Sequence, residues 1–219
     1  MSAEPDPSIS DPATLPGQIV LASSNPGKVR EISELLQGLG IRIVPQSEFR
    51  IAEAEESGLT FVENAILKAR NAARFSGLPS IADDSGIEVD ILNGAPGIYS
   101  SRYAGTGASD EENVTKLLND LADVPEFQRS ARFQCVMVYM AHESDPTPLI
   151  CQGTWEGSIS FTPRGTNGFG YDPVFYVPTH HCTSAELPAE IKNILSHRAQ
   201  ALQKLVEMLK NWKLKDRRL

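Results

Sequence analysis

Apolar and polar positions alternate along the chain with two periods, one typical of strands and one typical of helices. Gln18 to Ala22 is a short apolar run that ends in small polar residues, and Pro26 to Leu39 then carries apolar side chains at helical spacing. This order predicts a strand, a loop and a helix, followed by a second strand at Ile41 to Val44. Asn25 can cap the helix with Pro26 at its first position, so the free N–H groups at the helix start point toward the loop.

A second helix carries clear start and stop signals. Thr60 and Glu63 have the spacing of a capping box, which predicts a helix that runs to about Phe75 and is closed by Gly77. One polar stripe lies on this helix and consists of Asn64, Lys68 and Asn71.

The rest of the chain continues the alternation. Ser109 and Glu112 are placed to cap a third helix that runs through Leu121. The remaining apolar runs predict strands at Pro79 to Ala82, Ile87 to Leu92, Arg132 to Met140, Leu149 to Phe161 and Pro173 to Val177. Asp83 to Gly86 is expected to be the turn between the first two, and helical segments are expected on either side of Ser196-His197-Arg198. With no internal repeat and no linker, the pattern favours one α/β unit with a mixed sheet.

Composition is that of a single folded domain. The chain has 219 residues, of which 41% are hydrophobic and 22% charged, enough to bury a sizeable core. Residues 1–17 hold four prolines and are expected to form a disordered extension, residues 18–212 the domain, and residues 213–219 a basic tail. No stretch approaches the ~18 consecutive apolar residues of a membrane helix, and the start has no signal-peptide pattern.

Charge and cysteine usage narrow the class of protein. A formal net charge of −8 argues against tight, sequence-independent binding to nucleic acid, although a local basic pocket could hold a small polyanion. Cys135, Cys151 and Cys182 lack the spacing of a disulfide framework or a zinc knuckle, which favours a reduced, cytoplasmic setting. The tract His180-His181-Cys182 matches no tetrahedral metal site and is expected to be a polar surface loop.

Three short polar islands at the ends of apolar runs carry the candidate chemistry. They are Ser23-Ser24-Asn25-Pro26-Gly27-Lys28, Asp83-Asp84-Ser85-Gly86 and Gly168-Phe169-Gly170-Tyr171-Asp172-Pro173. In this order they offer a lysine loop that attracts anions, a carboxylate pair that could hold a divalent cation, and a glycine turn with rings for stacking. Together they indicate a phosphate ester of a nucleotide as the ligand.

The first island is not the phosphate loop of the ATPases. Ala22 stands at the first glycine position of that motif, and Val29 follows Lys28 where the motif has serine or threonine. A helix N-terminus and an ammonium group still make an anion site. Taken alone, however, the island is more simply interpreted as a capped turn with a solvent-facing lysine.

The second island leaves several interpretations open. Adjacent residues of an extended backbone point to opposite sides, so only one of Asp83 and Asp84 faces a given ligand unless the turn reorients them. Asp84-Ser85-Gly86 also matches half of an aspartic protease site. The chain has no second Asp-Ser/Thr-Gly, so only a dimer could complete that site. A plain turn is the simplest interpretation of the tripeptide by itself.

The third island and the segment near the last helix could surround a ring. Glycines permit close backbone approach, Phe169 offers a stacking surface, and Asp172 can accept a hydrogen bond from a ligand, while hairpin chemistry is the simpler alternative. Lys192, His197 and Arg198 add three possible cations, in a region where helix capping alone would explain Ser196.

Five segments together resemble the inosine/xanthosine triphosphate pyrophosphatase family, whose members remove aberrant purine nucleotides from the precursor pool. The segments are SSNPGK, ESGLTFVENAILKA, IADDSGIEVDILNGAPGIYSSRYAG, GTNGFGYDPVF and LSHRAQAL. The resemblance runs from about Ile19 to Lys210. It implies an elongated mixed α/β fold with two lobes around a central nucleotide cleft, a magnesium cofactor and a homodimer.

The resemblance also implies roles for individual residues. Asp84 would be the catalytic carboxylate and a magnesium ligand, assisted by Asp83 and by one of Glu55 and Glu56, and Ser85 would contact the substrate. Asn25, Lys28 and Lys68 would hold the triphosphate, and further substrate contacts would come from Ser23, Ser24, Pro26 and Gly27. The nucleoside would be surrounded by Phe169, Gly170, Tyr171, Asp172, Lys192, His197 and Arg198. The expected substrates are inosine, deoxyinosine and xanthosine triphosphates, and the products a nucleoside monophosphate and pyrophosphate.

Two other functions remain open. A non-catalytic nucleotide sensor would keep the binding residues but be expected to lose Asp84 or the lysines, all of which are present. An aspartic protease would cleave peptides without a metal ion.

Overall fold

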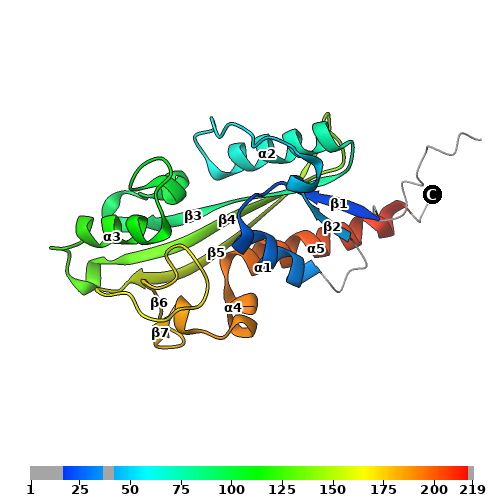
Figure 1. The fold of residues 1–219 in the computed structure, drawn as a ribbon. Coiled ribbons are helices and arrows are strands. Elements are labelled where there is room, and N and C mark those ends of the chain that lie inside the picture. Colours follow the sequence, from blue (N-terminus) through cyan, green and yellow to red (C-terminus); the bar gives the residue numbers. More distant parts are fainter. Residues whose placement is uncertain (1–16, 37–41, 217–219) are drawn as a thin grey trace, which may run out of the picture.

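The computed structural model describes residues 17–36 and 42–216, which form one seven-stranded mixed sheet (Figure 1). In the order β2-β1-β3-β4-β5-β6-β7, the first three strands are parallel to one another and the later pairs are antiparallel. The strands are β1 (Gln18–Leu21), β2 (Arg42–Pro45), β3 (Ser80–Val89), β4 (Ser130–Met140), β5 (Leu149–Ile159), β6 (Phe175–Val177) and β7 (Cys182–Thr183). The predicted α/β class with a mixed sheet is confirmed.

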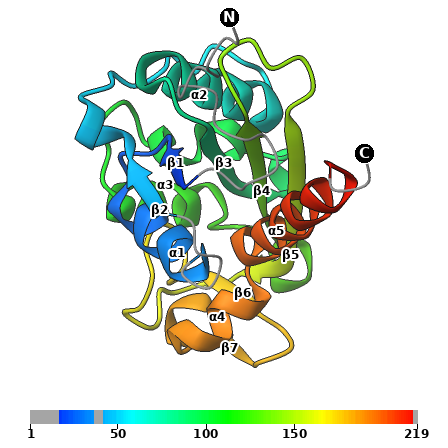
Figure 2. The same ribbon diagram turned by 90° about the vertical axis from the view of Figure 1, so that its right-hand side faces the viewer.

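Helices cover both faces of this sheet (Figure 1, Figure 2). They are α1 (Pro26–Leu36), α2 (Phe61–Ser76), α3 (Asp110–Asp120), α4 (Ala189–Leu195) and α5 (His197–Asp216). Buried alanines of α2 pack on one face of β1, β3 and β4, whereas α1 and α5 cover the opposite face. The far ends of the long strands pack with α3, β6 and α4 in a separate core. The long strands therefore join two packed regions, which gives the molecule its elongated shape.

β3 is one unbroken strand, so the prediction of two strands joined by a turn at Asp83–Gly86 is wrong. Its ladder with β4 runs through both aspartates without interruption. Gly86 serves close packing, because a Cβ atom there would lie 2.3 Å from the carbonyl oxygen of Gly97. Asp83 to Gly86 have the composition of a turn. Asp83 and Asp84, however, each form an ion pair with a lysine from a helix, which lowers the cost of burying two carboxylates in a sheet.

The capping signals of the second and third helices are confirmed. The Thr60 side chain accepts a hydrogen bond from the backbone N–H of Glu63, and Gly77 ends α2 in the left-handed conformation with φ 68°. Ser109 and Glu112 form a complete capping box at the start of α3.

Parts of some predictions fall at or beyond the ends of the described segments. The predicted first helix agrees with α1 as far as Leu36, and its residues 37–39 lie outside the described residues. The same holds for residues 1–16 of the predicted extension. α5 continues to Asp216 and so includes part of the predicted basic tail. Within residues 17–36 and 42–216, no helix is long and apolar enough to cross a membrane.

Candidate active site

A cleft opens where β1 ends beside β3. Leu21 pairs with Ile81, and beyond this pair β1 gives way to a loop while β3 continues to Val89. Asp83 and Asp84 lie two and three residues after Ile81, just past the end of this pairing. Ligands of α/β proteins commonly bind at the carboxyl ends of parallel strands, where loops replace the sheet. The register therefore places the first two polar islands side by side.

The first island is an ordered loop at the start of α1. Asn25 caps the helix by accepting a hydrogen bond from the backbone N–H of Lys28 at 3.1 Å. Ser23 accepts one from the N–H of Asn25 at 3.2 Å, and Ser24 accepts one from the Gln46 side chain at 3.1 Å. Lys28 is not a solvent-facing lysine, because its ammonium group forms an ion pair with Asp83.

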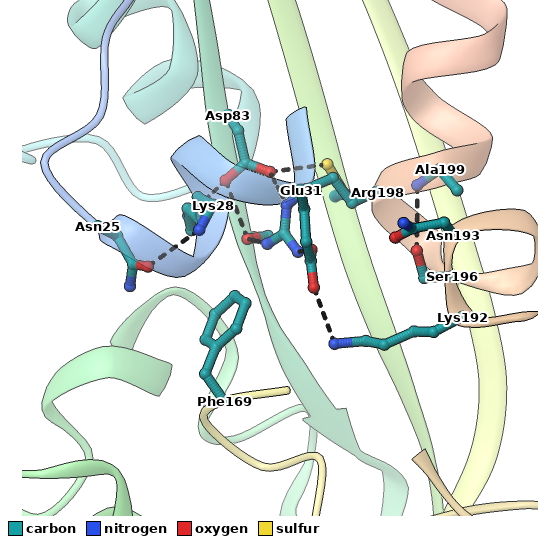
Figure 3. Close-up of polar contacts among 12 residues, drawn as sticks. Asn25, Lys28, Glu31, Asp83, Phe169, Lys192, Asn193, Ser196, Arg198 and Ala199 are labelled. Atoms are coloured by element: carbon teal, nitrogen blue, oxygen red, sulfur yellow. Dashed lines mark hydrogen bonds and ion pairs between the residues drawn. The ribbon is translucent and has the colours of Figure 1, made fainter. Parts of the chain in front are cut away.

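Asp83 is buried and points toward the face of the sheet that α1 and α5 cover (Figure 3). Besides Lys28, it contacts Nε of Arg198 at 3.2 Å and accepts a hydrogen bond from the Cys135 thiol at 3.0 Å. Burial alone would raise the pKa of Asp83, but the charges of Lys28 and Arg198 outweigh it and hold the pKa well below its usual value. Asp83 is therefore an ionised anchor for two cations.

Asp84 points to the opposite face, toward α2. Nζ of Lys68 lies 2.5 Å from Oδ1 of Asp84 and 3.1 Å from Oε1 of Glu56, and Nη1 of Arg102 lies 2.8 Å from Oε2 of Glu56. Burial raises the pKa of Asp84 even though Lys68 opposes the shift. Burial also acts on Glu56, but Lys68 and Arg102 outweigh it and lower the pKa of Glu56. As extended backbone requires, Asp83 and Asp84 face different partners.

Two adjoining cavities form the cleft. The larger, of about 510 Å³, has a mainly polar wall that includes Ser23, Ser24, Asn25, Lys28, Glu53, Glu56, Lys68, Asp83 and Arg102. The smaller, of about 120 Å³, is lined by residues that include Asp84, Ser85, Phe133, Phe169, Gly170, Tyr171, Asp172, Lys192, His197 and Arg198. Both are lined by Asn25, Lys28, Glu56 and Ser101, so they adjoin. Glu55 lines neither and is exposed.

Phe169 stands at the junction of α1 and the smaller cavity. It lies between two glycines in the left-handed region, Gly168 at φ 79° and Gly170 at φ 60°. Its ring centroid lies 5.2 Å from Nζ of Lys192 and 5.5 Å from the guanidinium carbon of Arg198. The ring also packs on Gly27, where a Cβ atom would come within 2.6 Å of it. Gly27 thus makes room for Phe169, and like Pro26 it lines neither cavity.

Tyr171 and Asp172 hold the third island in shape. The Tyr171 hydroxyl donates to the carbonyl oxygen of Ser100 at 2.7 Å. Asp172 is buried, lies 2.6 Å from Nζ of Lys192, and accepts hydrogen bonds from the backbone N–H of Phe169 at 2.9 Å and from Ser184 at 2.8 Å. Both carboxylate oxygens of Asp172 already bind groups of the protein, so Asp172 is not the free acceptor for a ligand that the sequence suggested.

Glu31 is a site residue that the sequence analysis did not find. Its carboxylate is buried and lies 2.9 Å from Nζ of Lys192 and 2.5 Å from Nη1 of Arg198 (Figure 3). Burial opposes ionisation, but both cations outweigh it and lower the pKa of Glu31. Its position three residues after Lys28, on the same side of the predicted helix, is the sequence signal that could have found it.

His197 is neutral, unlike the neighbouring cations. It is buried against Phe133, with ring centroids 4.6 Å apart and planes 10° apart. Burial, reinforced by the charge of Arg198, holds the pKa of His197 well below its usual value. Among the described residues its Nδ1 atom has no hydrogen-bond partner. Of the three predicted cations, Lys192 and Arg198 supply the charge, and His197 supplies a neutral ring nitrogen.

The arrangement bears on the predicted metal site and on the aspartic protease alternative. Across the part of the chain that the structure describes, no group of three His, Cys, Asp or Glu side chains is placed to hold a metal ion. Two carboxylates, Asp84 and Glu56, do converge on Lys68. Asp84-Ser85-Gly86 lies inside a strand, and Asp84 contacts Lys68, whereas an aspartic protease pairs two carboxylates across one proton.

Comparison with known proteins identifies the family of this chain. A model of the Ham1 family matches residues 19–208. The dITP/XTP pyrophosphatase of Vibrio cholerae is 60% identical over 192 residues, 88% of this chain and 96% of the relative. The enzyme of the same name from Escherichia coli O157:H7 is 58% identical over 194 residues, 89% of this chain and 98% of the relative.

Solved structures give the same result. A HAM1 protein from Coxiella burnetii superposes with a TM-score of 0.82 at 54% identity, over 89% of this chain and 98% of that one. The Ham1 protein of Staphylococcus aureus gives a TM-score of 0.78 at 42% identity, over 89% and 98% of the two chains. The resemblance seen in the five sequence segments is confirmed, and the chain belongs to the Ham1 family.

Proposed function

We propose that this protein hydrolyses inosine, deoxyinosine and xanthosine triphosphates to the monophosphate and pyrophosphate, and thereby cleanses the purine nucleotide pool. The observation that carries the proposal is the two-part cleft, in which a charged cavity of about 510 Å³ adjoins an aromatic one of about 120 Å³. Lysine and arginine suit a triphosphate, and a ring flanked by cations suits a purine. The names of the relatives from Vibrio cholerae and Escherichia coli support this choice of substrate.

The donors on the α2 side of β3 fit a magnesium ion. Oxygens of Asp84 and Glu56 lie 2.5 Å and 3.1 Å from one ammonium nitrogen, that of Lys68, so the two carboxylates already converge on a cation. Carboxylate oxygens are the ligands that magnesium prefers. Asp84 and Glu56 would hold the ion, since Glu55 is exposed and Asp83 is engaged on the other face. When bound, magnesium neutralises phosphate charge and polarises phosphorus.

The charge of the larger cavity gives a reason for a metal requirement. Its ionisable lining residues are three cations and three carboxylates: Lys28, Lys68, Arg102, Glu53, Glu56 and Asp83. This lining is close to neutral overall, whereas a nucleoside triphosphate carries several negative charges. Additional positive charge would strengthen its binding, and a divalent cation supplies that charge.

The chain's own residues would then perform the reaction. Asp84 accepts a proton from the attacking water. Lys28 and Lys68 stabilise the charge that develops on the leaving pyrophosphate. The N-terminus of α1, capped by Asn25, offers N–H groups to phosphate oxygens. Asp83 keeps Lys28 in place by their ion pair.

The smaller cavity would recognise the nucleoside. Phe169 stacks on the purine without selecting one base over another. Arg198 and His197 offer hydrogen bonds to the 6-oxo group, while Lys192 lies beside them. Ser85 lies between Asp83 and Arg198, at 3.1 Å and 3.0 Å from their nearest polar atoms, and would contact the substrate from there.

One assay tests the proposal. Purified protein is incubated with inosine triphosphate, and pyrophosphate is measured with magnesium and with an added chelator. Release that requires magnesium is the expected result. Binding of the nucleotide without release would indicate a nucleotide sensor, and metal-independent cleavage of a peptide substrate would indicate a protease, and either result would overturn the proposal.

We further propose that the protein is a homodimer of the cytoplasm. The dimer follows from the family resemblance, and three cysteines that form no disulfide in the described chain agree with a reducing compartment. Light scattering of the purified protein would give twice the mass of one 23.9 kDa chain. A monomeric mass would contradict the dimer.

A further inference from the structure

We infer that Arg102, which lies outside the three polar islands, is a third phosphate-binding residue, and that Glu56 holds it in the cleft until a polyphosphate replaces the carboxylate. This inference deepens the proposed function and rests on it for the nature of the ligand. Arg102 lines the larger cavity together with Lys28 and Lys68, and its side chain is 30% exposed. It is therefore both accessible to a ligand and close to the two lysines.

The backbone that carries Arg102 is fixed from both sides. The short helical segment Gly97–Arg102 follows β3, and Asn113 on α3 binds its end. Nδ2 of Asn113 donates to the carbonyl oxygen of Ser101 at 3.2 Å, and Oδ1 accepts from the N–H of Ala104 at 2.8 Å. These two hydrogen bonds bracket Arg102 in the sequence. A cation positioned in this way loses little freedom when it binds a ligand.

The guanidinium group is also held at its tip. Its central carbon lies 5.2 Å from the ring centroid of Tyr99, and Nη1 lies 2.8 Å from Oε2 of Glu56. Oε1 of Glu56 is the acceptor for Lys68, so one carboxylate bridges two cations. A phosphate group presents oxygens at a spacing similar to that of a carboxylate, and arginine binds either with the same planar fork. A phosphate group of a polyphosphate can therefore replace the Glu56 carboxylate as the partner of Arg102.

Arg74 provides a matched control. It makes the same two kinds of contact, with its guanidinium carbon 5.6 Å from the Phe75 ring and Nε 3.9 Å from Glu143, but its side chain is 69% exposed on α2 and lines neither cavity of the cleft. Glu53 serves as a control for charge, because it lines the larger cavity as Glu56 does. Neither Arg102 nor Lys68 has an ion pair with Glu53 in the described chain.

The experiment measures binding of inorganic tripolyphosphate by calorimetry, with chelator present so that no metal contributes. Arg102→Ala is expected to weaken binding about tenfold, the effect of one charge-assisted hydrogen bond, and Arg74→Ala to leave it unchanged. Glu56→Gln is expected to strengthen binding more than Glu53→Gln does, because it releases Arg102 and Lys68. In the double variant Glu56→Gln/Arg102→Ala, most of that gain is expected to be lost.

Arg102→Lys keeps the positive charge but lacks the planar guanidinium group, so it is expected to bind tripolyphosphate with intermediate affinity. This variant serves as the test if Arg102→Ala does not fold. The inference is overturned if Arg102 variants bind tripolyphosphate as wild type does, if the gain from Glu56→Gln survives in the double variant, or if neither wild type nor Glu56→Gln binds tripolyphosphate. Hydrolysis of inosine triphosphate by the wild type is measured in parallel. Active wild type with unaffected Arg102 variants rejects only this inference, whereas inactive wild type rejects the proposed function.

Discussion

Glu31 and Arg198 form a buried ion pair, 2.5 Å long, that joins α1 to α5 beneath the floor of the cleft. Lys192 on α4 shares the same carboxylate at 2.9 Å. One glutamate thus ties three helices together around the nucleoside side of the cleft. Removing its charge would leave two buried cations with fewer counter-charges, which costs far more than removing a surface pair.

Glu31→Gln is therefore expected to lower the free energy of unfolding by about 2 kcal/mol, less than for an isolated buried pair because Asp83 and Asp172 still neutralise the two cations. Urea denaturation at neutral pH measures the change. Glu34→Gln, on the exposed side of the same helix, is the control and should stay within about 0.5 kcal/mol of wild type. Equal stability of the two variants would contradict the role given to Glu31.

Glu31 also shows where prediction from the sequence ends. Local signals located α2 and α3, because Thr60, Gly77 and Ser109 act on backbone groups a few residues away. The spacing from Lys28 could have placed Glu31 beside the first polar island, but its partner Arg198 is 167 residues distant in the sequence, and no local pattern predicts that contact. Arg102 was missed for the same reason, since its carboxylate partner lies 46 residues before it.

The error at β3 has a different cause. The segment Asp83–Gly86 has the composition of a turn, and only the cations that meet it and the packing of Gly86 on Gly97 make it a strand. Lys28 and Lys68 are recognisable in the sequence as candidate site residues, but only the fold shows that they pair with Asp83 and Asp84. The sequence thus indicated most of the side chains that line the cleft, but not which of them contact one another.

Burial of neutral His197 predicts a pH dependence of stability. Its pKa in the folded protein is well below the ordinary value of 6.5, so below pH 6.5 the unfolded chain binds a proton that the folded protein does not. Stability should therefore fall as pH falls from 6.5 to 5, by about 1.4 kcal/mol per pH unit from this group.

His197→Gln should remove that contribution, which is measured as the difference in slope between wild type and variant in urea denaturation. Carboxylates with lowered pKa values, such as Asp83 and Glu31, lose their contribution only at more acidic pH. His142→Gln, at an exposed position, is the control. If the free energy of unfolding depends on pH with the same slope in His197→Gln as in wild type, the buried ring of His197 is not the source of the pH dependence.

Asp84→Asn tests the catalytic carboxylate. The change keeps the size of the side chain but removes the charge that would hold magnesium and accept the proton, so kcat for inosine triphosphate should fall by at least ~10²-fold. Asp90→Asn, a carboxylate of an exposed ion pair with Arg132, should retain wild-type kcat. Turnover above about a tenth of wild type in Asp84→Asn would refute the role of Asp84.

Lys28 and Lys68 should determine which phosphoanhydride bond is cleaved. If both grip the outer phosphates as the leaving group, pyrophosphate should be released in one step, and chromatography at early times should show no inosine diphosphate. Lys28→Ala and Lys68→Ala should each raise KM and lower kcat, because the charge on the leaving group grows in the transition state. Inosine diphosphate and orthophosphate as the first products would exclude this arrangement.

Arg198 should distinguish purines by the group at position 6. The 6-oxo group of inosine accepts hydrogen bonds, whereas the 6-amino group of adenosine donates them, so the buried guanidinium of Arg198 would lose a partner with adenosine triphosphate. A buried donor left without a partner costs about 1–3 kcal/mol. Arg198→Ala is therefore expected to reduce kcat/KM for inosine triphosphate more than for adenosine triphosphate, and so to narrow the ratio between them.

Because Arg198 also contacts Asp83 and Glu31, the variant must first be shown to be folded by its thermal melting curve. Glu31→Gln then serves as a second reference, since it perturbs the same ion network while keeping the guanidinium in the cleft. If discrimination depends on the hydrogen bond to the base, only Arg198→Ala narrows the ratio. Equal losses on both nucleotides in Arg198→Ala would instead assign Arg198 to phosphate binding or to holding α1 against α5.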